Sequence, residues 1–239
     1  MNVSVVLPSF NRARLLPITI PTYFQEDVSE VILVDDCSSD NTAEVVKELQ
    51  TRFPTLRYFR NEVNSKQPYT QNVAISKVQS EYIYFGDDDS VLYPGSIRNL
   101  LNVMREKNAD IVGGRALALF FPEQIDELDE FLSHYRNRIA TEANQIVDLS
   151  TLSTNFTYTV KEPIRVPFCH ASCLCKTQVA REMQFDVKIE GNAYREETDF
   201  LIRATLAGYT IYYTSSANQI NLPSAMCSGG ARSKNHRHW

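Results

Sequence analysis

The chain has 239 residues, of which 43% are hydrophobic and 22% are charged, so it can bury a core as one α/β domain or as one domain with an appended lobe. Its formal net charge of -5 argues against a general nucleic-acid-binding protein. No apolar run approaches the roughly 18 residues of a membrane-spanning helix, and the N-terminus lacks the pattern of a signal peptide. We therefore expect a cytoplasmic protein; association with the inner face of the membrane stays open.

Apolar runs alternate with helical patterns through the first half of the chain. Four runs predict buried strands at residues 3–7, 31–34, 56–59 and 82–86. Helical spacing predicts helices after Arg12, after Asn41, which forms a capping box with Glu44, and from Pro68 to about Val78. This order predicts an α/β fold with a mostly parallel central sheet flanked by helices and a Rossmann-like first half.

The second half of the chain has a less regular pattern. Apolar residues from Ile97 to Met104 recur at the spacing of an amphipathic helix. The further elements that we expect are a strand at 110–121, an inserted helix and a loop or hairpin at 122–165, a strand at 166–176, a helix at 195–207 and a strand at 209–214.

Polar clusters follow three of the predicted strands, at residues 8–12, 35–40 and 87–90. Because ligands bind beyond the carboxyl ends of parallel strands, we expect these clusters to share one site. Asp87, Asp88 and Asp89 have no basic residue within several positions downstream, so their charges raise one another's pKa. A divalent cation removes this cost, and Asp87 and Asp89 offer the oxygen ligands that Mg²⁺ or Mn²⁺ shares with substrate phosphates. The alternative is an acidic surface turn, because Gly and Asp favour turns.

The cysteines at 169, 173 and 175 lie near His170, which suggests a zinc site. Their spacing lacks the paired Cys-x-x-Cys of structural zinc sites. If the segment is a strand, its alternation places the three cysteines on one face and His170 on the other. We therefore interpret them as buried thiols in a reducing compartment.

Several motifs in order resemble those of one family. The loop from Pro8 to Arg12 resembles a Pro-Ser/Thr-aromatic-Asn loop, and residues 31–40 resemble a Val-Asp-Asp-Gly-Ser-x-Asp segment with Cys37 in place of Gly. Asn64, Gln71 and Asn72 fall where the family has an Asn-rich helix start, and residues 87–89 match its DXD motif. Over about residues 2–115, and less closely over 165–232, the chain is similar to the family 2 inverting glycosyltransferases, which have the GT-A fold.

The resemblance implies a division of the chain and a set of donor-binding residues. Residues 1–115 would be the nucleotide-sugar-binding half, 116–220 the acceptor and catalytic half with an insertion at about 122–165, and 221–239 a flexible basic tail. Asp36 would accept a hydrogen bond from the base, Asp87 would approach the ribose or the metal, and Asp89 would be the direct ligand of Mn²⁺ or Mg²⁺. The full expected set is Pro8, Ser9, Asn11, Arg12, Asp36, Lys66, Asn72, Asp87, Asp88 and Arg232. Alternatively, Asp36 caps the turn before the Asn41 helix, and Pro8 merely ends a strand.

The segment from Arg195 to Phe200 resembles the family's Glu-Asp-x-Asp motif, whose second acid is the catalytic base. By this register Glu197 is the base, with Glu in place of the usual Asp, and Glu196 is the reserve candidate. The alternative is that these acids only stabilise the first turn of a helix.

The tail resembles a Ser-Gly-Gly-x-Arg stretch of some members, in which a nearby His completes the metal shell. Asn221 stands at that His position, and His236 or His238 could substitute.

The resemblance implies a metal-dependent inverting glycosyltransferase that moves a sugar from a nucleoside diphosphate, expected to be UDP, to a hydroxyl of a glycan, polysaccharide or glycolipid. Two alternatives stay open. A sugar-phosphate nucleotidyltransferase would need a Gly-rich loop after the first strand, and residues 8–14 contain no glycine. A non-catalytic nucleotide-sugar-binding domain would need no base.

Overall fold

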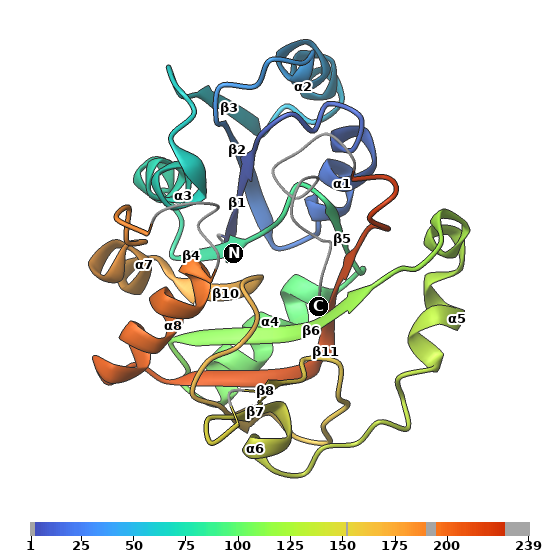
Figure 1. Cartoon of the computed structure of the whole chain (residues 1–239), viewed down its shortest axis with the longest axis vertical. Helices are drawn as coiled ribbons and strands as arrows, with labels where there is room; N and C mark the ends of the chain where they lie inside the picture. The colour runs from blue at the N-terminus through green and yellow to red at the C-terminus, as the bar shows by residue number, and fades with distance from the viewer. Residues whose placement is uncertain (1–2, 152, 190–194, 228–239) are drawn as a thin grey trace.

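The structure, a computed structural model, describes residues 3–151, 153–189 and 195–227. Its main feature is a nine-stranded sheet in the order β3-β2-β1-β4-β10-β6-β11-β5, with β9 paired to β11 (Figure 1). The strands of this sheet are β1 Val3–Ser9, β2 Val28–Asp35, β3 Leu56–Arg60, β4 Tyr82–Phe85, β5 Ser90–Leu92, β6 Ile111–Ala118, β9 Ile164–Arg165, β10 Cys173–Lys176 and β11 Ile211–Asn221. This is the expected α/β domain with a mostly parallel central sheet flanked by helices.

Helices cover both faces of the sheet, as the alternation of elements predicted. They are α1 Leu16–Tyr23, α2 Thr42–Arg52, α3 Lys66–Lys77, α4 Ser96–Glu106, the 3₁₀ helix Pro122–Glu127, α5 Leu128–Ser133, α6 Ala143–Ile146, α7 Thr177–Met183 and α8 Glu196–Leu206. The first four strands in the chain pair in parallel, β2 with β3 and β1 with both β2 and β4. Their carboxyl ends therefore meet at one edge of the sheet.

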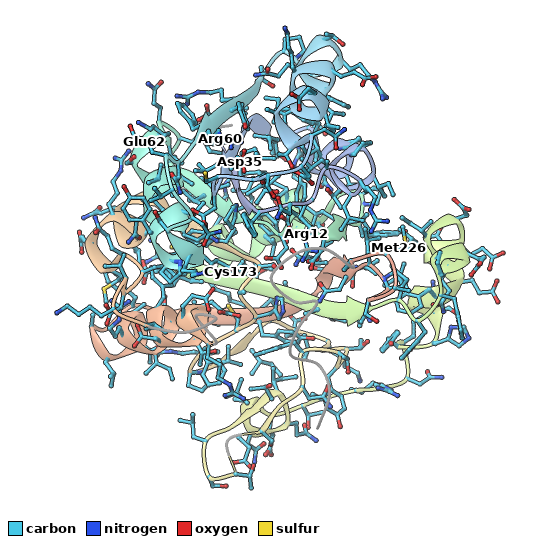
Figure 2. The ribbon with its side chains drawn as sticks, turned by 45° about the horizontal axis from the view of Figure 1, so that its top comes forward. Arg12, Asp35, Arg60, Glu62, Cys173 and Met226 are labelled. Atoms are coloured by element: carbon cyan, nitrogen blue, oxygen red, sulfur yellow. The ribbon has the colours of Figure 1, made fainter. Side chains whose placement is uncertain are left out.

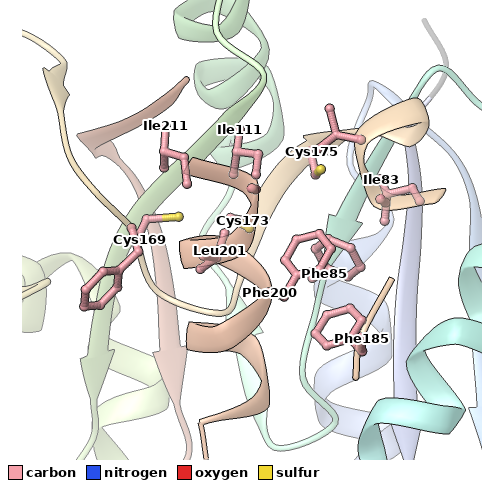
Figure 3. Close-up of a cluster of buried hydrophobic side chains, with 14 of the residues drawn as sticks. Ile83, Phe85, Ile111, Cys169, Cys173, Cys175, Phe185, Phe200, Leu201 and Ile211 are labelled. Carbon is pink, nitrogen blue, oxygen red and sulfur yellow. The ribbon is translucent and has the colours of Figure 1, made fainter. Parts of the chain in front are cut away.

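The two faces of the sheet bury separate sets of side chains, because successive residues of a strand point to opposite sides. In β4, Ile83 and Phe85 face the core beneath α3, α7 and α8, whereas Tyr84 faces the core beneath α1, α2 and α4. Phe85 packs edge-on against Phe200 of α8 and against Phe185, as Figure 3 shows. This packing fixes the start of α8 over the carboxyl half of β4.

The strand expected at residues 166–176 is shorter than predicted, because β10 begins at Cys173. Before it, the chain crosses over β6, where a Cβ on Gly113 would lie 2.4 Å from Cβ of Cys169. Glycine is therefore required on β6 so that this segment can cover the sheet. All three cysteines are buried thiols, as expected, and Cys173 and Cys175 share one face of β10.

The insertion expected at about 122–165 contains a 3₁₀ helix, α5, α6 and a small hairpin of β7 Val147–Asp148 and β8 Ser153–Thr154. Phe131 and Leu132 of α5 join a third cluster of buried side chains that also contains Ile220 of β11. The insertion is thereby anchored to the last strand.

Three local predictions are wrong. Asn41 precedes α2 without a side-chain cap, and the acceptor for the first turn is instead Asp40, whose Oδ1 lies 3.1 Å from the amide nitrogen of Thr42. The last strand continues to Asn221 instead of ending at 214, because a bulge after Tyr213 lets its polar residues rejoin β6. Residues 222–227, assigned to a flexible tail, pack against the sheet, with Leu222 donating to the Asp89 carbonyl.

Within the described residues, no helix has the length and apolar character needed to cross a bilayer.

Candidate active site

The loops after β1 and β2 are joined by the side chain of Asn11. Its Oδ1 accepts a hydrogen bond of 2.8 Å from the backbone amide of Ser39, and the backbone amide of Asn11 donates to Oγ of Ser38 at 2.8 Å. Asn11 has a φ of 55°, in the left-handed region that Asn tolerates better than most residues. Two of the predicted polar clusters therefore form one continuous surface at the carboxyl edge of the sheet.

Arg12 links this surface to the acidic loop that follows β4. Its Nε donates to Oδ1 of Asp88 at 3.3 Å, and its Nη2 lies 3.5 Å from Oδ2 of Asp89. Nη1 donates to the Cys227 carbonyl at 2.6 Å, and the arginine is buried near the end of the described chain (Figure 2). The sequence argument for the acidic triplet missed this cation, because Arg12 lies some seventy residues earlier in the chain.

The acidic loop still carries more negative charge than Arg12 neutralises. Burial and the neighbouring charge of Asp89 raise the pKa of Asp88 to about 7, although Arg12 acts in the opposite direction. Three carboxylates beside one guanidinium favour an additional cation, and carboxylate oxygens suit Mg²⁺ or Mn²⁺. Among the described residues, however, no group of three or more His, Cys, Asp or Glu side chains is arranged to hold a metal ion. The divalent metal, with Asp87 and Asp89 as candidate ligands, therefore stays a prediction.

Asp87 is held by residues that the sequence did not single out. Its Oδ2 accepts hydrogen bonds from Nε2 of Gln219 at 2.9 Å and from Oγ of Ser172 at 3.2 Å. The Gln219 amide is itself oriented by the Tyr84 hydroxyl, which donates to its Oε1 at 2.9 Å. The carbonyl of Asp87 accepts from the Tyr23 hydroxyl at 2.8 Å. Ser172 and Gln219 thus hold the carboxylate, and Tyr23 holds the backbone of Asp87, all from distant segments that no local motif could reveal.

Asp36 is buried at the end of β2 and caps α3. Its Oδ1 accepts from Nδ2 of Asn61 and from the amide of Ser65, both at 2.8 Å, and its Oδ2 accepts from the amide of Lys66 at 2.9 Å. The capping alternative thus named the wrong helix, because Asp36 caps α3 instead of α2. These bonds leave one of the four lone-pair positions of the carboxylate, so the expected contact with a base stays a prediction.

The other expected donor-binding residues lie at the same edge, with different degrees of exposure. Pro8 and Ser9 are the last residues of β1, and the Lys66 side chain is exposed at the start of α3. Both amide atoms of Asn72 bond the backbone of Phe185, donating to its carbonyl at 2.9 Å and accepting from its amide at 2.8 Å. This pairing joins α3 to the segment after α7.

The glutamate pair lies at the first turn of α8, the helix that packs against β4 through Phe200 and Phe85. Arg195 precedes the helix with a φ of 66°, and the Glu196 side chain is 4% exposed. Burial, a hydrogen bond with the Glu197 carboxyl and the charge of Glu197 raise the pKa of Glu196 to about 9. The charge of Asp87 also raises the pKa of Glu196.

Two expected features of the tail have different outcomes. Asn221 ends β11 beside the acidic loop, and its Oδ1 accepts from Oγ of Ser90 at 2.7 Å. Arg232, His236 and His238 lie outside the described residues.

A mostly parallel sheet with buried carboxylates at the carboxyl edge is typical of α/β proteins that bind ligands at that edge. The profile described as Glycosyl transferase family 2 matches residues 4–173, more than half of the chain. The chain therefore belongs to glycosyltransferase family 2.

Two curated relatives match about half of the chain. The GalNAc(5)-diNAcBac-PP-undecaprenol beta-1,3-glucosyltransferase of Campylobacter jejuni is 33% identical over 114 residues, which cover 46% of this chain and 37% of the relative. The poly(ribitol-phosphate) beta-N-acetylglucosaminyltransferase TarP of Staphylococcus aureus is 32% identical over 121 residues, which cover 47% of this chain and 36% of the relative. The matched part thus spans little more than a third of each relative.

Two solved structures share the fold. That of S. aureus TarS 1-349 in complex with UDP-GlcNAc superposes with a TM-score of 0.65 at 16% identity, covering 96% of this chain and 62% of the TarS 1-349 chain. That of the mannosyltransferase PcManGT from Pyrobaculum calidifontis, in complex with GDP-Man and Mn²⁺, gives 0.62 at 17% identity, covering 92% of this chain and 56% of the other. These likenesses support the GT-A architecture.

Proposed function

We propose that this protein is an inverting glycosyltransferase that moves a sugar from a nucleoside diphosphate, preferentially UDP, to an acceptor hydroxyl. The observation that carries the proposal is the packing of Phe85 of β4 against Phe200 of α8, with ring centres 5.8 Å apart, which sets the acidic loop after β4 near the glutamate pair that begins α8. The acidic loop can then act on the leaving diphosphate, while the glutamate pair accepts the proton of the acceptor hydroxyl.

The donor would bind along the edge formed by the loops after β1, β2 and β4. Asp36 offers its remaining lone pair to the base, and the loop of Asp87, Asp88 and Asp89 faces the diphosphate. A divalent cation held by Asp89 and Asp87, when bound, neutralises charge that develops on the diphosphate. Gln219 and Ser172 keep Asp87 in place for that task.

Glu197 would act as the catalytic base. Burial and the hydrogen bond with Glu197 raise the pKa of Glu196 to about 9, so Glu196 keeps its proton at neutral pH, and the register of the family's motif assigns the base to Glu197. The acceptor oxygen attacks the anomeric carbon, the bond from that carbon to the diphosphate breaks, and Glu197 takes the hydroxyl proton. Single displacement inverts the anomeric centre, as water attack does in inverting glycosidases.

The acceptor would be a glycan, a polysaccharide or a lipid-linked saccharide. Two relatives support this class by their names, one acting on an undecaprenol-linked saccharide and the other on poly(ribitol-phosphate). By the same analogy, we extend the proposal to a role in polysaccharide synthesis at the cytoplasmic face of a membrane.

Calorimetry with UDP, with and without Mn²⁺, tests the donor site. We expect UDP to bind in the presence of Mn²⁺ and to lose most of its affinity when the metal is chelated. Equal affinity in both conditions, or no binding in either, would refute the metal-dependent donor site.

A donor screen separates the proposed transferase from its alternatives. Slow hydrolysis of a UDP-sugar to the free sugar indicates a transferase, because water replaces the acceptor. Release of inorganic diphosphate from UTP and a sugar phosphate would instead identify a nucleotidyltransferase. Donor binding without any turnover, even with acceptor extracts, would identify a binding domain.

A further inference from the structure

Arg115 on β6 is a buried arginine whose bonded partners are neutral. Arg115 is 7% exposed. Its Nε donates to Oδ1 of Asn218 at 2.7 Å, and its Nη1 donates to Oγ1 of Thr159 at 3.2 Å. Among the described residues, no carboxylate forms an ion pair with it. The guanidinium has five N–H donors, so two such bonds leave most of its donor capacity available.

Burying the charged guanidinium of Arg115 costs free energy unless an anion pairs with it. Burial lowers the pKa of Arg115, and the like charge of Arg136 lowers it further. Arg12, the other arginine buried to this degree in the described chain, pairs with Asp88 and Asp89. Buried charges in proteins are generally paired, and a planar guanidinium suits the oxygens of a phosphate. The missing counter-charge is therefore one that a ligand can supply.

Arg115 lies on the catalytic face at the catalytic edge of the sheet. Gly113 is level with Cys173 of β10, whose neighbour Leu174 is level with Tyr84 of β4. Arg115, two residues beyond Gly113 on a strand parallel to β4, is thus near the level of the acidic loop. It shares the face of Gly113, which Cys169 covers, and so the face that carries α8. Two strand spacings, about 10 Å, separate β6 from β4.

The insertion places more positive charge beside Arg115. Thr159, which bonds Arg115, also donates from its Oγ1 to the Tyr135 carbonyl at 2.9 Å. The exposed Arg136 follows Tyr135 and acts electrostatically on Arg115. The guanidinium of Arg138 lies 5.3 Å from the centre of the Tyr135 ring. Arg115 and Arg136, from two distant segments, therefore place positive charge in the same region.

We propose that Arg115, assisted by Arg136, forms a subsite for a phosphate group carried by the acceptor. This inference rests on the proposed transferase function and adds that the acceptor is anionic. At about two strand spacings from the donor's diphosphate loop, the subsite is separate from the place of the leaving group. It would hold the phosphate so that a neighbouring hydroxyl reaches Glu197.

Titration of the full chain with glycerol 3-phosphate, monitored by calorimetry, tests the subsite, with glycerol as the uncharged probe. We expect saturable binding of glycerol 3-phosphate and none of glycerol. Arg115→Met should weaken phosphate binding roughly tenfold or more, the effect of losing one charge-assisted hydrogen bond. Arg136→Gln should weaken it less, and Arg165→Gln, which removes an exposed arginine on β9, should leave it unchanged.

Each outcome decides the matter. Absence of saturable phosphate binding to the wild type, or equal affinity in Arg115→Met with an unchanged unfolding midpoint, overturns the subsite. If Arg115→Met fails to fold, the phosphate affinities of Arg136→Gln and Arg165→Gln are compared instead. Equal affinity in these two variants overturns the subsite. Competition between UDP and glycerol 3-phosphate would assign the arginines to the donor and also overturn the inference. Because the phosphate titration needs no nucleotide, its failure is distinct from failure of the UDP titration, which concerns the proposed function.

Discussion

Replacing Glu196 with Gln tests the electrostatics of the glutamate pair most sharply. Glu196 has a pKa of about 9 in the folded protein, whereas an unfolded glutamate ionises near its ordinary pKa of about 4.3. Because the folded pKa is the higher one, the stability contribution is complete below the unfolded pKa and is lost as the pH rises through the folded pKa. The free energy of unfolding should therefore fall between about pH 5 and pH 9, by up to about 1.4 kcal/mol per pH unit.

Glutamine is close in shape to a protonated glutamate and does not ionise. Glu196→Gln should thus match the wild type near pH 5 and exceed its stability at pH 8 by up to about 4 kcal/mol, which is three pH units at the limiting slope. Urea unfolding at several pH values, with the exposed Glu130→Gln as the matched control, measures the difference. The glutamine amide can still donate to Glu197, so the variant should also keep most of the donor-hydrolysis activity.

Two results would refute this reasoning. A stability difference that stays constant between pH 5 and 8 would mean that Glu196 does not hold a proton in the folded protein. Loss of turnover in Glu196→Gln with intact donor binding would make Glu196 the base, as the reserve assignment allowed.

Three other substitutions test separate parts of the account. Asp89→Ala should abolish metal-dependent UDP binding in calorimetry, and unchanged affinity would refute its role as a ligand. Gln219→Leu removes the donor to Asp87 and leaves the buried Tyr84 hydroxyl without its acceptor. The variant should therefore lose about 1–3 kcal/mol of unfolding free energy in urea and bind UDP and metal more weakly. Wild-type values for both quantities would contradict the described network. Cys37 has a φ of 63°, where glycine avoids a cost of about 1–2 kcal/mol but loses about 0.5–1 kcal/mol through chain entropy. Cys37→Gly should therefore raise the free energy of unfolding by up to about 1 kcal/mol, and a lower unfolding midpoint would show that the strain is absent.

Local patterns predicted the parallel half of the sheet well, because its strands are buried on both faces and read as apolar runs. The residues from Val31 to Val34 illustrate this, since each of them is fully buried in β2. The same reasoning failed for β11, whose carboxyl half contains Asn218 and Gln219. These polar residues fit a strand because buried partners, Arg115 and Tyr84, satisfy them.

The candidate site was predictable where its residues follow a strand directly, as the acidic loop does after β4. The glutamate pair begins a helix, and it was found only through its resemblance to the family's Glu-Asp-x-Asp motif. Three residues contact the loop from positions between 76 residues away, for Arg12 and Asp88, and 132 residues away, for Gln219 and Asp87; the third is Ser172. Contacts of this kind depend on how the sheet is ordered, which the sequence pattern does not specify.

Cys37 was noticed as a departure from the family's usual glycine, and its positive φ gives the physical reason for that preference. The sequence could not reveal that Asp36 caps α3, because its partners at Asn61, Ser65 and Lys66 lie beyond the next strand.

The most direct test of the central claim is the turnover of Glu197→Gln in UDP-sugar hydrolysis, measured together with its donor affinity. We predict unchanged donor affinity and a rate reduced by about 10²–10⁴-fold, the usual contribution of a general base. A variant that binds the donor and hydrolyses it at the wild-type rate would contradict the account.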